Sequence, residues 1–179
     1  RSIFKNRTDT SNWICYHEAL GNTTGVYLNL TNANAGTSSA FFNNTTPTSS
    51  VVSVGVMNEG NGSGDNIVAY CFAEIEGYSK FGSYTGNGST DGTFVYTGFR
   101  PAFVLLKRYQ NGPFGATDGM WVLHDSVRNP NNDGTMNDLY ANVSDAENTT
   151  NANDIDILSN GFKARANNNN VNYSTGLYI

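Results

Sequence analysis

The chain has 179 residues, of which 38% are hydrophobic and 14% charged, and its formal net charge at pH 7 is −5. This length and composition suffice for one or two compact domains. No apolar run reaches the roughly 18–20 residues that a membrane-spanning helix requires, so we expect no membrane insertion. Ten basic residues stand against fifteen acidic ones without a basic cluster, which argues against a nucleic-acid partner.

Asn, Thr, Ser and Gly are abundant, and aromatic residues make up 12% of the chain. This composition favours turns and half-buried strands over helices. Strand-forming runs alternate with turn dipeptides such as Asn-Gly and Asp-Gly. The predicted strands cover residues 13–17, 26–30, 51–56, 67–72, 80–84, 94–96, 102–107, 120–124, 139–143 and 155–158. One helical turn is expected at 144–148, and the fold class is all-β, typical of a sandwich or jelly roll.

Segments in the first part of the chain resemble segments in the second part, in the same order. The matching pairs are 3–6 with 105–108, 13–17 with 121–125, 26–33 with 139–146, and 63–68 with 174–179. The order of these pairs predicts two tandem β-sandwich or jelly-roll-like repeats.

The alignment predicts where each repeat lies. Residues 1–76 form the C-terminal part of a first β-sandwich repeat, and residues 77–179 form a second repeat that lacks its closing strand. Both repeats are expected to be incomplete at the chain ends, because both cuts fall inside strands. We therefore expect these residues to be part of a longer repetitive polypeptide, or neighbouring chains to supply the missing strands.

Four segments carry a resemblance to a known family: YSKFGSYTGNGSTDGTFVYTGFRPAFVLLK (78–107), WVLHDSVRN (121–129), LSNGFK (158–163) and YCFAE (70–74). Together they resemble an uncharacterised repeat domain of predicted tail or virion structural proteins of marine and environmental tailed phages. The resemblance implies a non-enzymatic component of the virion, in the tail, a tail fibre or a surface decoration. It also implies partners among other copies of the chain and other virion proteins, and it supplies no catalytic residue.

Two further functions remain open. A carbohydrate-binding module would contact host surface glycans through exposed aromatic rings, and Tyr78 and Tyr84 are the candidate contact residues. Trp13 and Trp121 are considered as well, although equivalent places in two repeats favour the core for both. A subunit of a bacterial surface filament or adhesin is the other alternative.

The two cysteines and two histidines give little sign of catalytic or metal chemistry. Cys15 and Cys71 each lie in an apolar strand, where a buried free thiol is expected first and a disulfide second. His17 and His124 occupy neighbouring register positions and are expected to face solvent or a loop. With no cluster at ligand spacing, neither a metal nor a cofactor is expected.

Two polar motifs suggest alternatives with less support. Glu74 and Glu76 would lie on one face of an extended strand, and a carboxylate pair across a groove would serve glycoside hydrolysis. Residues 129–134 resemble the opening of a calcium loop, but Tyr140 stands where such a loop needs Glu. A turn is expected there instead.

Overall fold

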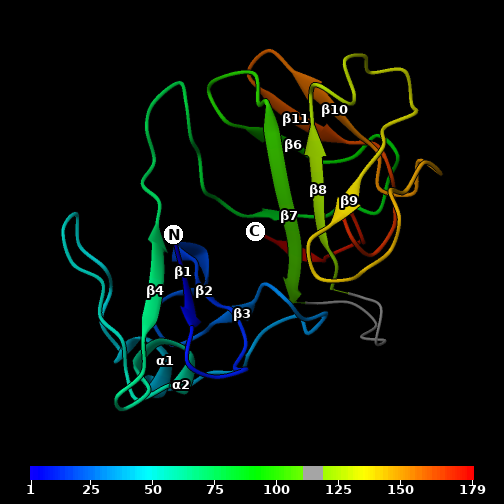
Figure 1. Cartoon of the computed structure of the whole chain (residues 1–179). Coiled ribbons are helices and arrows are strands. Elements are labelled where there is room, and N and C mark those ends of the chain that lie inside the picture. The colour runs from blue at the N-terminus through cyan, green and yellow to red at the C-terminus, as the bar shows by residue number, and fades with distance from the viewer. Residues whose placement is uncertain (111–118) are drawn as a thin grey trace.

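The structure is a computed structural model that describes residues 1–110 and 119–179. Two β-rich lobes lie beside each other, with both chain ends near the region between them (Figure 1). For description, lobe one comprises residues 1–76 and lobe two comprises the described residues from 77 onward. No helix within the described residues is long and apolar enough to cross a membrane.

Lobe one is built on a single four-stranded antiparallel sheet in the order β3-β2-β1-β4. Its elements are β1 (Ser2–Asn6), β2 (Ile14–Tyr16), the 3-10 helix η1 (Glu18–Leu20), β3 (Val26–Tyr27), α1 (Ser39–Phe42), α2 (Asn58–Asn61) and β4 (Ile67–Cys71). The helices have four residues or fewer, so they serve as turns between strands.

Lobe two contains two antiparallel sheets, in the orders β5-β12-β7-β8-β9 and β10-β11-β6. Its elements are β5 (Tyr84–Thr85), β6 (Phe94–Tyr96), β7 (Phe103–Gln110), β8 (Trp121–Asp125), β9 (Leu139–Tyr140), β10 (Ile155–Leu158), β11 (Gly161–Ala164) and β12 (Leu177–Tyr178). The all-β prediction is therefore confirmed.

Several local predictions are wrong. Residues 51–56 pair with no strand, although Val52 and Val54 pack against the core of lobe one as their alternation suggests. Residues 80–83 are not a strand, and the expected helical turn at 144–148 does not form. The structure also contains β1, β11 and β12, which the predicted set of strands does not include.

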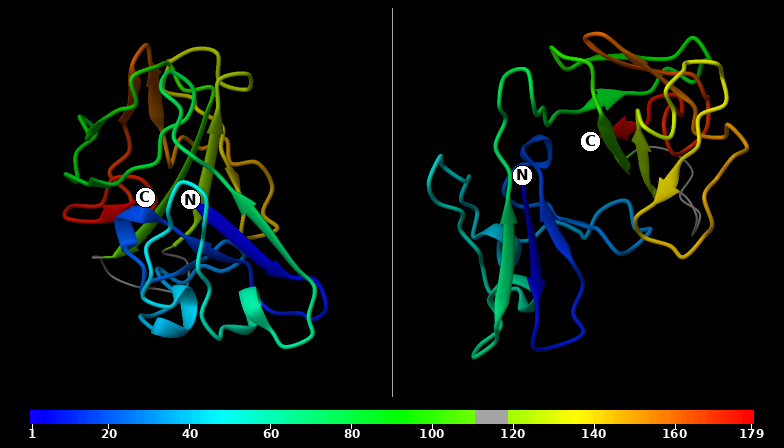
Figure 2. Two further views of the ribbon diagram at one scale, coloured as in Figure 1. Left: turned by 90° about the vertical axis from the view of Figure 1, so that its left-hand side faces the viewer. Right: turned by 45° about the horizontal axis from the view of Figure 1, so that its top comes forward.

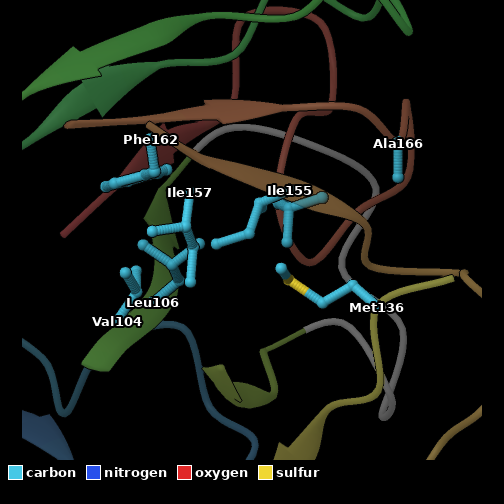
Figure 3. Packing of buried hydrophobic residues seen from close by; sticks show 8 residues of the cluster. Val104, Leu106, Met136, Ile155, Ile157, Phe162 and Ala166 are labelled. Atoms are coloured by element: carbon cyan, nitrogen blue, oxygen red, sulfur yellow. The ribbon is translucent and has the colours of Figure 1, made fainter. Parts of the chain in front are cut away.

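Each lobe has its own hydrophobic core. In lobe two, Val104 and Leu106 of β7 face Ile155 and Ile157 of β10 (Figure 3), so its two sheets pack face to face. In lobe one the core lies between the sheet and the segment from α1 to α2. It consists of Phe4, Ile14, Tyr16, Phe42 and Met57.

The two lobes contain sheets with the same strand order, and the register of three neighbouring strands is the same in both. β3-β2-β1-β4 in lobe one corresponds to β9-β8-β7-β12 in lobe two. In β1 and β2, Phe4 lies opposite Ile14, and Leu106 lies opposite Val122 at the corresponding positions of β7 and β8. β12 is covered on its outer edge by β5, whereas β4 is the outermost strand of its sheet.

The same side-chain hydrogen bond joins the start of β2 to the segment after β3, and the start of β8 to the segment after β9. The backbone N–H of Trp13 donates to Oδ1 of Asn29 at 2.9 Å. The backbone N–H of Trp121 donates to Oδ1 of Asn142, also at 2.9 Å. The alignment of residues 13–17 with 121–125 therefore corresponds to an equivalence of backbone position and hydrogen bonding.

Candidate functional site

The candidate site is an open hollow of about 560 Å³ on lobe one. It lies over the face of the sheet formed by alternate residues of β1 and β4, next to the turn before β2. The residues that line it include Lys5, Arg7, Asp9, Trp13, Val68 and Tyr70.

Two stacked aromatic rings form one wall of the hollow. The ring centroids of Trp13 and Tyr70 are 6.5 Å apart and their planes differ by 17°. Trp13 is half-buried, and 48% of Tyr70 is exposed. Among the described residues, no acceptor binds the indole N–H of Trp13. The wall therefore offers apolar ring surface and the indole N–H of Trp13 as a donor.

Charged groups form the rim of the hollow. Lys5 Nζ donates to the backbone oxygen of Asp9 at 3.1 Å, and Arg7 is exposed. The Asp9 carboxylate accepts the backbone N–H of Ser11 at 2.8 Å, and hydrogen bonds from Ser11 and Asn58 lower the pKa of Asp9 below its ordinary value. Among the described residues that line the hollow, Asp9 carries the only carboxylate.

Trp121 occupies the equivalent position in lobe two but is fully buried. Its indole N–H donates to the backbone oxygen of Tyr27 in lobe one at 2.8 Å. The Arg1 guanidinium lies 4.8 Å from the ring centroid and Lys107 Nζ lies 5.5 Å from it. The expectation that both tryptophans are core residues therefore holds for Trp121 and is wrong for Trp13, because only Trp121 is covered by the other lobe.

The two tyrosines named as glycan contacts lie in different environments. Tyr78 is 77% exposed, in the turn that follows β4. Tyr84 stacks on Tyr178 at 4.8 Å and packs edge-on against Phe162. Its hydroxyl donates to the backbone oxygen of Val171 at 2.6 Å, and burial raises its pKa well above the ordinary value. Both the ring and the hydroxyl of Tyr84 are thus engaged inside lobe two.

Both histidines are buried, which corrects the expectation that they face solvent or a loop. His17 is 2% exposed, and its Nδ1 accepts the backbone N–H of Ala19 at the start of η1. His124 is fully buried on the core side of β8 and neither ring nitrogen has a hydrogen-bond partner in the structure. Burial lowers the pKa of each imidazole to about 3, so both are neutral at pH 7.

Cys15 and Cys71 are free thiols. Cys15 lies opposite Ile3, whereas Cys71 lies opposite Ser2. Because neighbouring residues of β1 point to opposite faces of the sheet, the two thiols are directed to opposite faces and cannot bond. Cys71 is exposed, contrary to its expected burial.

We expect a thiol reagent to modify Cys71 in the folded protein and to modify Cys15 only after unfolding. Burial raises the pKa of Cys15 to about 11, and the thiolate is the reactive form. Mass spectrometry after a timed reaction with iodoacetamide measures both sites, with the Cys71→Ser variant as the control. A reductant should leave the melting temperature unchanged, because the two thiols form no disulfide. A lower melting temperature after reduction would contradict this arrangement.

The acidic and amide motifs stabilise turns. Glu74 lies beyond β4, and its carboxylate accepts Lys80 Nζ and the backbone N–H of Phe81, both at 2.9 Å. Hydrogen bonding by Lys80 lowers the pKa of Glu74. Glu76 is exposed in the same turn region, so neither carboxylate belongs to the hollow.

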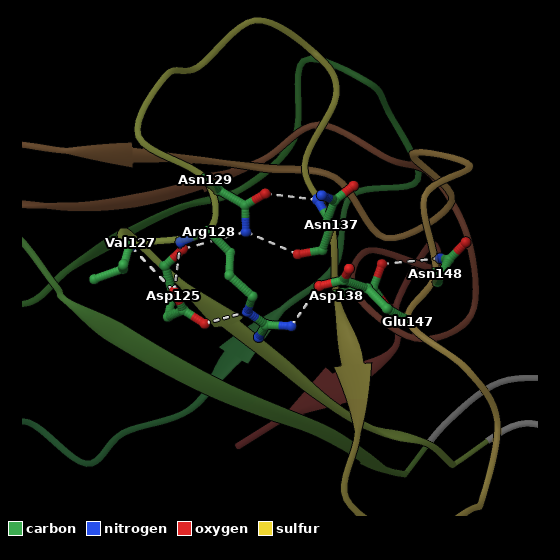
Figure 4. Close-up of polar contacts among 8 residues, drawn as sticks. All are labelled: Asp125, Val127, Arg128, Asn129, Asn137, Asp138, Glu147 and Asn148. Atoms are coloured by element: carbon green, nitrogen blue, oxygen red, sulfur yellow. Dashed lines mark hydrogen bonds and ion pairs between the residues drawn. The ribbon is translucent and has the colours of Figure 1, made fainter.

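Side chains of residues 129–134 form hydrogen bonds that stabilise the loop itself. Asn129 donates to the backbone oxygen of Asn137 at 2.8 Å and accepts its N–H at 2.6 Å (Figure 4). Beside it, Arg128 binds the carboxylates of Asp125 and Glu147 at 2.6 and 2.7 Å. Within the described residues, no group of three or more His, Cys, Asp or Glu side chains forms a metal site.

These observations define an all-β protein with two lobes and an open, aromatic and charged hollow on lobe one. The chain matches the family described as "Domain of unknown function (DUF7483)" over residues 2–179 and belongs to that family. No curated protein and no solved structure matches the chain significantly. Sequence reasoning missed the hollow, although the alternation of Lys5 with Arg7 and of Val68 with Tyr70 placed these residues on common faces.

Proposed function

We propose that the chain is a non-enzymatic structural or attachment module of a bacteriophage virion, composed of two tandem copies of one β unit. In the tail, a tail fibre or a surface decoration, such units would form a compact array of short antiparallel strands. Its partners would be other copies of itself and other virion proteins.

The observation that carries the tandem arrangement is the agreement between the two lobes in strand order, register and the Trp–Asn hydrogen bond. The agreement extends to the outer strand. Val68 lies opposite Lys5 in lobe one, and the backbone groups of Ile179 and Lys107 exchange two 2.9 Å hydrogen bonds in lobe two. Strand register is highly specific, and it recurs across three strands and at the last two residues of the chain, which follow a register irregularity in β12. This recurrence supports duplication of a single unit.

Two features support a role without catalysis. His124, the more enclosed of the two imidazoles, lies in the core without access to a substrate. The lining of the hollow offers aromatic ring faces and charged groups, which suit binding to another molecular surface. Its carboxylate is that of Asp9. The assignment to a virion is supported by the resemblance of residues 78–107, 121–129 and 158–163 to phage tail and virion domains.

The virion assignment is tested by purifying DNA-containing particles from the source culture by density gradient. Quantitative mass spectrometry should find the chain at a constant ratio to the major capsid protein, and antibody labelling should place it on the tail or particle surface. Recovery in the cell-envelope fraction and not in the particles would contradict the assignment and favour a bacterial filament or adhesin.

A carbohydrate-binding module is the second candidate, favoured by the exposed Trp13–Tyr70 wall beside Arg7 and Asp9. Sugar rings stack on such surfaces while polar groups bind the hydroxyls. Screening the full chain on an array of bacterial surface glycans tests this function. Binding that Trp13→Ala abolishes and that Tyr78→Ala leaves intact would place a glycan in the hollow.

A further inference from the structure

We propose that a second copy of this chain docks head to tail on the first. The hollow of lobe one in one copy would cover the outer face of β8 and β9 in lobe two of its neighbour. The contact would repeat the one that lobe two already makes with lobe one inside a single chain. This inference rests on the equivalence of the two lobes in the proposed function and is independent of the assignment to a virion.

The contact within the chain is a mixed apolar and polar interface. Trp121 and Ile179 of lobe two pack against Cys15 and Val26 of lobe one in a shared buried cluster. The segment that follows β3 extends from lobe one toward lobe two (Figure 2), and Asn34 of this segment donates to the backbone oxygen of Tyr109.

The surface that lobe two uses in this contact has an uncovered counterpart on lobe one. Lys107 and Trp121 are fully buried and Ile179 is 5% exposed. Their equivalents on lobe one, which are Lys5, Trp13 and Val68, are all half-exposed and line the hollow. The same residue positions are therefore covered by a neighbour in one lobe and open in the other.

The surface that lobe one uses likewise has an uncovered counterpart on lobe two. Cys15 and Val26 are fully buried beneath lobe two. By register, their equivalents are Leu123, which is half-buried, and Leu139, which is 36% exposed. Burial of these side chains by a partner would remove apolar surface from water, which is the main favourable contribution to such contacts.

A third pair of positions extends this receiving surface. Arg1 stacks over Trp121 across the contact within the chain. The equivalent of Arg1 on lobe two is Phe103, because Ser2 and Val104 occupy equivalent register positions. Phe103 is 55% exposed, so an aromatic side chain is available to meet Trp13 of a second copy.

The tryptophan indole has a matching backbone acceptor. Within the chain, the indole N–H of Trp121 donates to the backbone oxygen of Tyr27 at 2.8 Å. In the head-to-tail contact, the indole N–H of Trp13 would donate to the backbone oxygen of Tyr140. Tyr140 pairs with Val122 in the register in which Tyr27 pairs with Ile14.

The lysine has a matching acceptor as well. Lys107 Nζ donates to the backbone oxygen of Leu30 at 3.2 Å across the contact. Counting from the equivalent residues Asn29 and Asn142, the counterpart of Leu30 is Val143. Lys5 Nζ of a second copy would therefore reach the backbone oxygen of Val143.

Charge complementarity favours a copy of this chain as the occupant. Counting along the chain from the equivalent residues Asn29 and Asn142, the counterpart of Asn34 is Glu147. Counting from Lys5 and Lys107, the counterpart of Tyr109, whose backbone oxygen Asn34 binds, is Arg7. Glu147 and Arg7 are both exposed. The Glu147 carboxylate already accepts from Arg128, and a carboxylate has capacity for further donors. Opposite charges would thus lie near each other where the contact within the chain joins a neutral side chain to a backbone oxygen.

The two docking surfaces differ, so the contact is heterologous: in a dimer one copy keeps its receiving surface free and the other keeps its hollow free. Association should therefore continue beyond a dimer. A symmetric dimer would instead use a single surface twice. This difference provides a test in which two defective variants complement each other.

The test is analytical ultracentrifugation of the full chain across a range of concentrations. The wild type should form species larger than a dimer. Trp13→Ala removes the hollow's wall, and Leu139→Glu places a charge on the receiving surface. Each variant alone should remain a monomer, with self-association weakened at least tenfold. An equimolar mixture should form a one-to-one heterodimer and stop there.

Three outcomes would overturn the proposal: a wild type that stays monomeric at the highest concentration, variants that associate as the wild type does, or a mixture that forms no heterodimer. Unfolding curves of both variants show whether they remain folded. A glycan bound at Trp13 in a strictly monomeric wild type would assign the hollow to the sugar. The virion assignment is tested separately, by mass spectrometry of purified particles, and does not depend on the result of the association experiment.

Discussion

Trp121→Ala should lower the free energy of unfolding by about 3–5 kcal/mol, the usual effect of removing a fully buried tryptophan. The ring fills the space between the lobes together with Cys15 and Val26. Its loss also leaves the backbone oxygen of Tyr27 without the indole donor, and a buried acceptor without a partner is costly. The stability of the whole molecule therefore depends on this contact.

Trp13→Ala is the matched control, since Trp13 makes the same backbone hydrogen bond but lines an open hollow. We expect this substitution to lower stability by about 1 kcal/mol, because a half-exposed ring buries less surface. Urea unfolding of dilute protein followed by circular dichroism measures both effects. Equal losses for the two variants would contradict the different burial of the two rings.

Acid should destabilise the protein through its buried histidines, and His124→Leu should reduce that effect. In the folded protein, burial and the nearby Arg128 lower the pKa of His124 to about 3, whereas an unfolded histidine titrates near 6.5. Between these values the unfolded state binds the extra proton, so stability falls as the pH is lowered from about 6.5 toward 3. The contribution of His124 reaches roughly 3 kcal/mol at pH 4.

His124→Leu removes this contribution and the two buried nitrogens that lack partners. We expect a gain of about 1–2 kcal/mol at pH 7 and a larger gain at pH 4. His17→Asn is the comparison, because its pKa is also lowered to about 3 and an Asn oxygen can still cap η1. Urea unfolding at several pH values measures how the free energy of unfolding of each variant depends on pH. A pH dependence in His124→Leu identical to that of the wild type would contradict the account.

The sequence predicted the positions of several strands that pair with another strand in the structure. Residues 94–96 and 155–158 form β6 and β10 with the predicted bounds. Residues 51–56 also contain alternating apolar residues, but their backbone forms hydrogen bonds outside a sheet. One of these runs from the backbone N–H of Gly55 to the backbone oxygen of Phe41. The local pattern at 51–56 therefore predicts the inward direction of Val52 and Val54 but not strand pairing, since pairing depends on a distant segment.

The candidate site was harder to predict for the same reason. Trp13 and Trp121 have similar neighbours in the sequence, and only contact between the lobes makes one accessible and the other buried. His124 shows a comparable effect, because its burial depends on the sheet packed against β8. The exposure of Tyr78 could be predicted from the sequence, because its neighbours indicate a turn after β4.

The equivalence of the two lobes is tested most directly by a crystal structure of the chain. Superposing β1, β2 and β4 on β7, β8 and β12 should bring Trp13 onto Trp121, with Asn29 and Asn142 each accepting the tryptophan backbone N–H. A different strand order in the two sheets, or a register of β1, β2 and β3 shifted by one residue from that of β7, β8 and β9, would contradict a duplicated unit and the head-to-tail contact inferred from it.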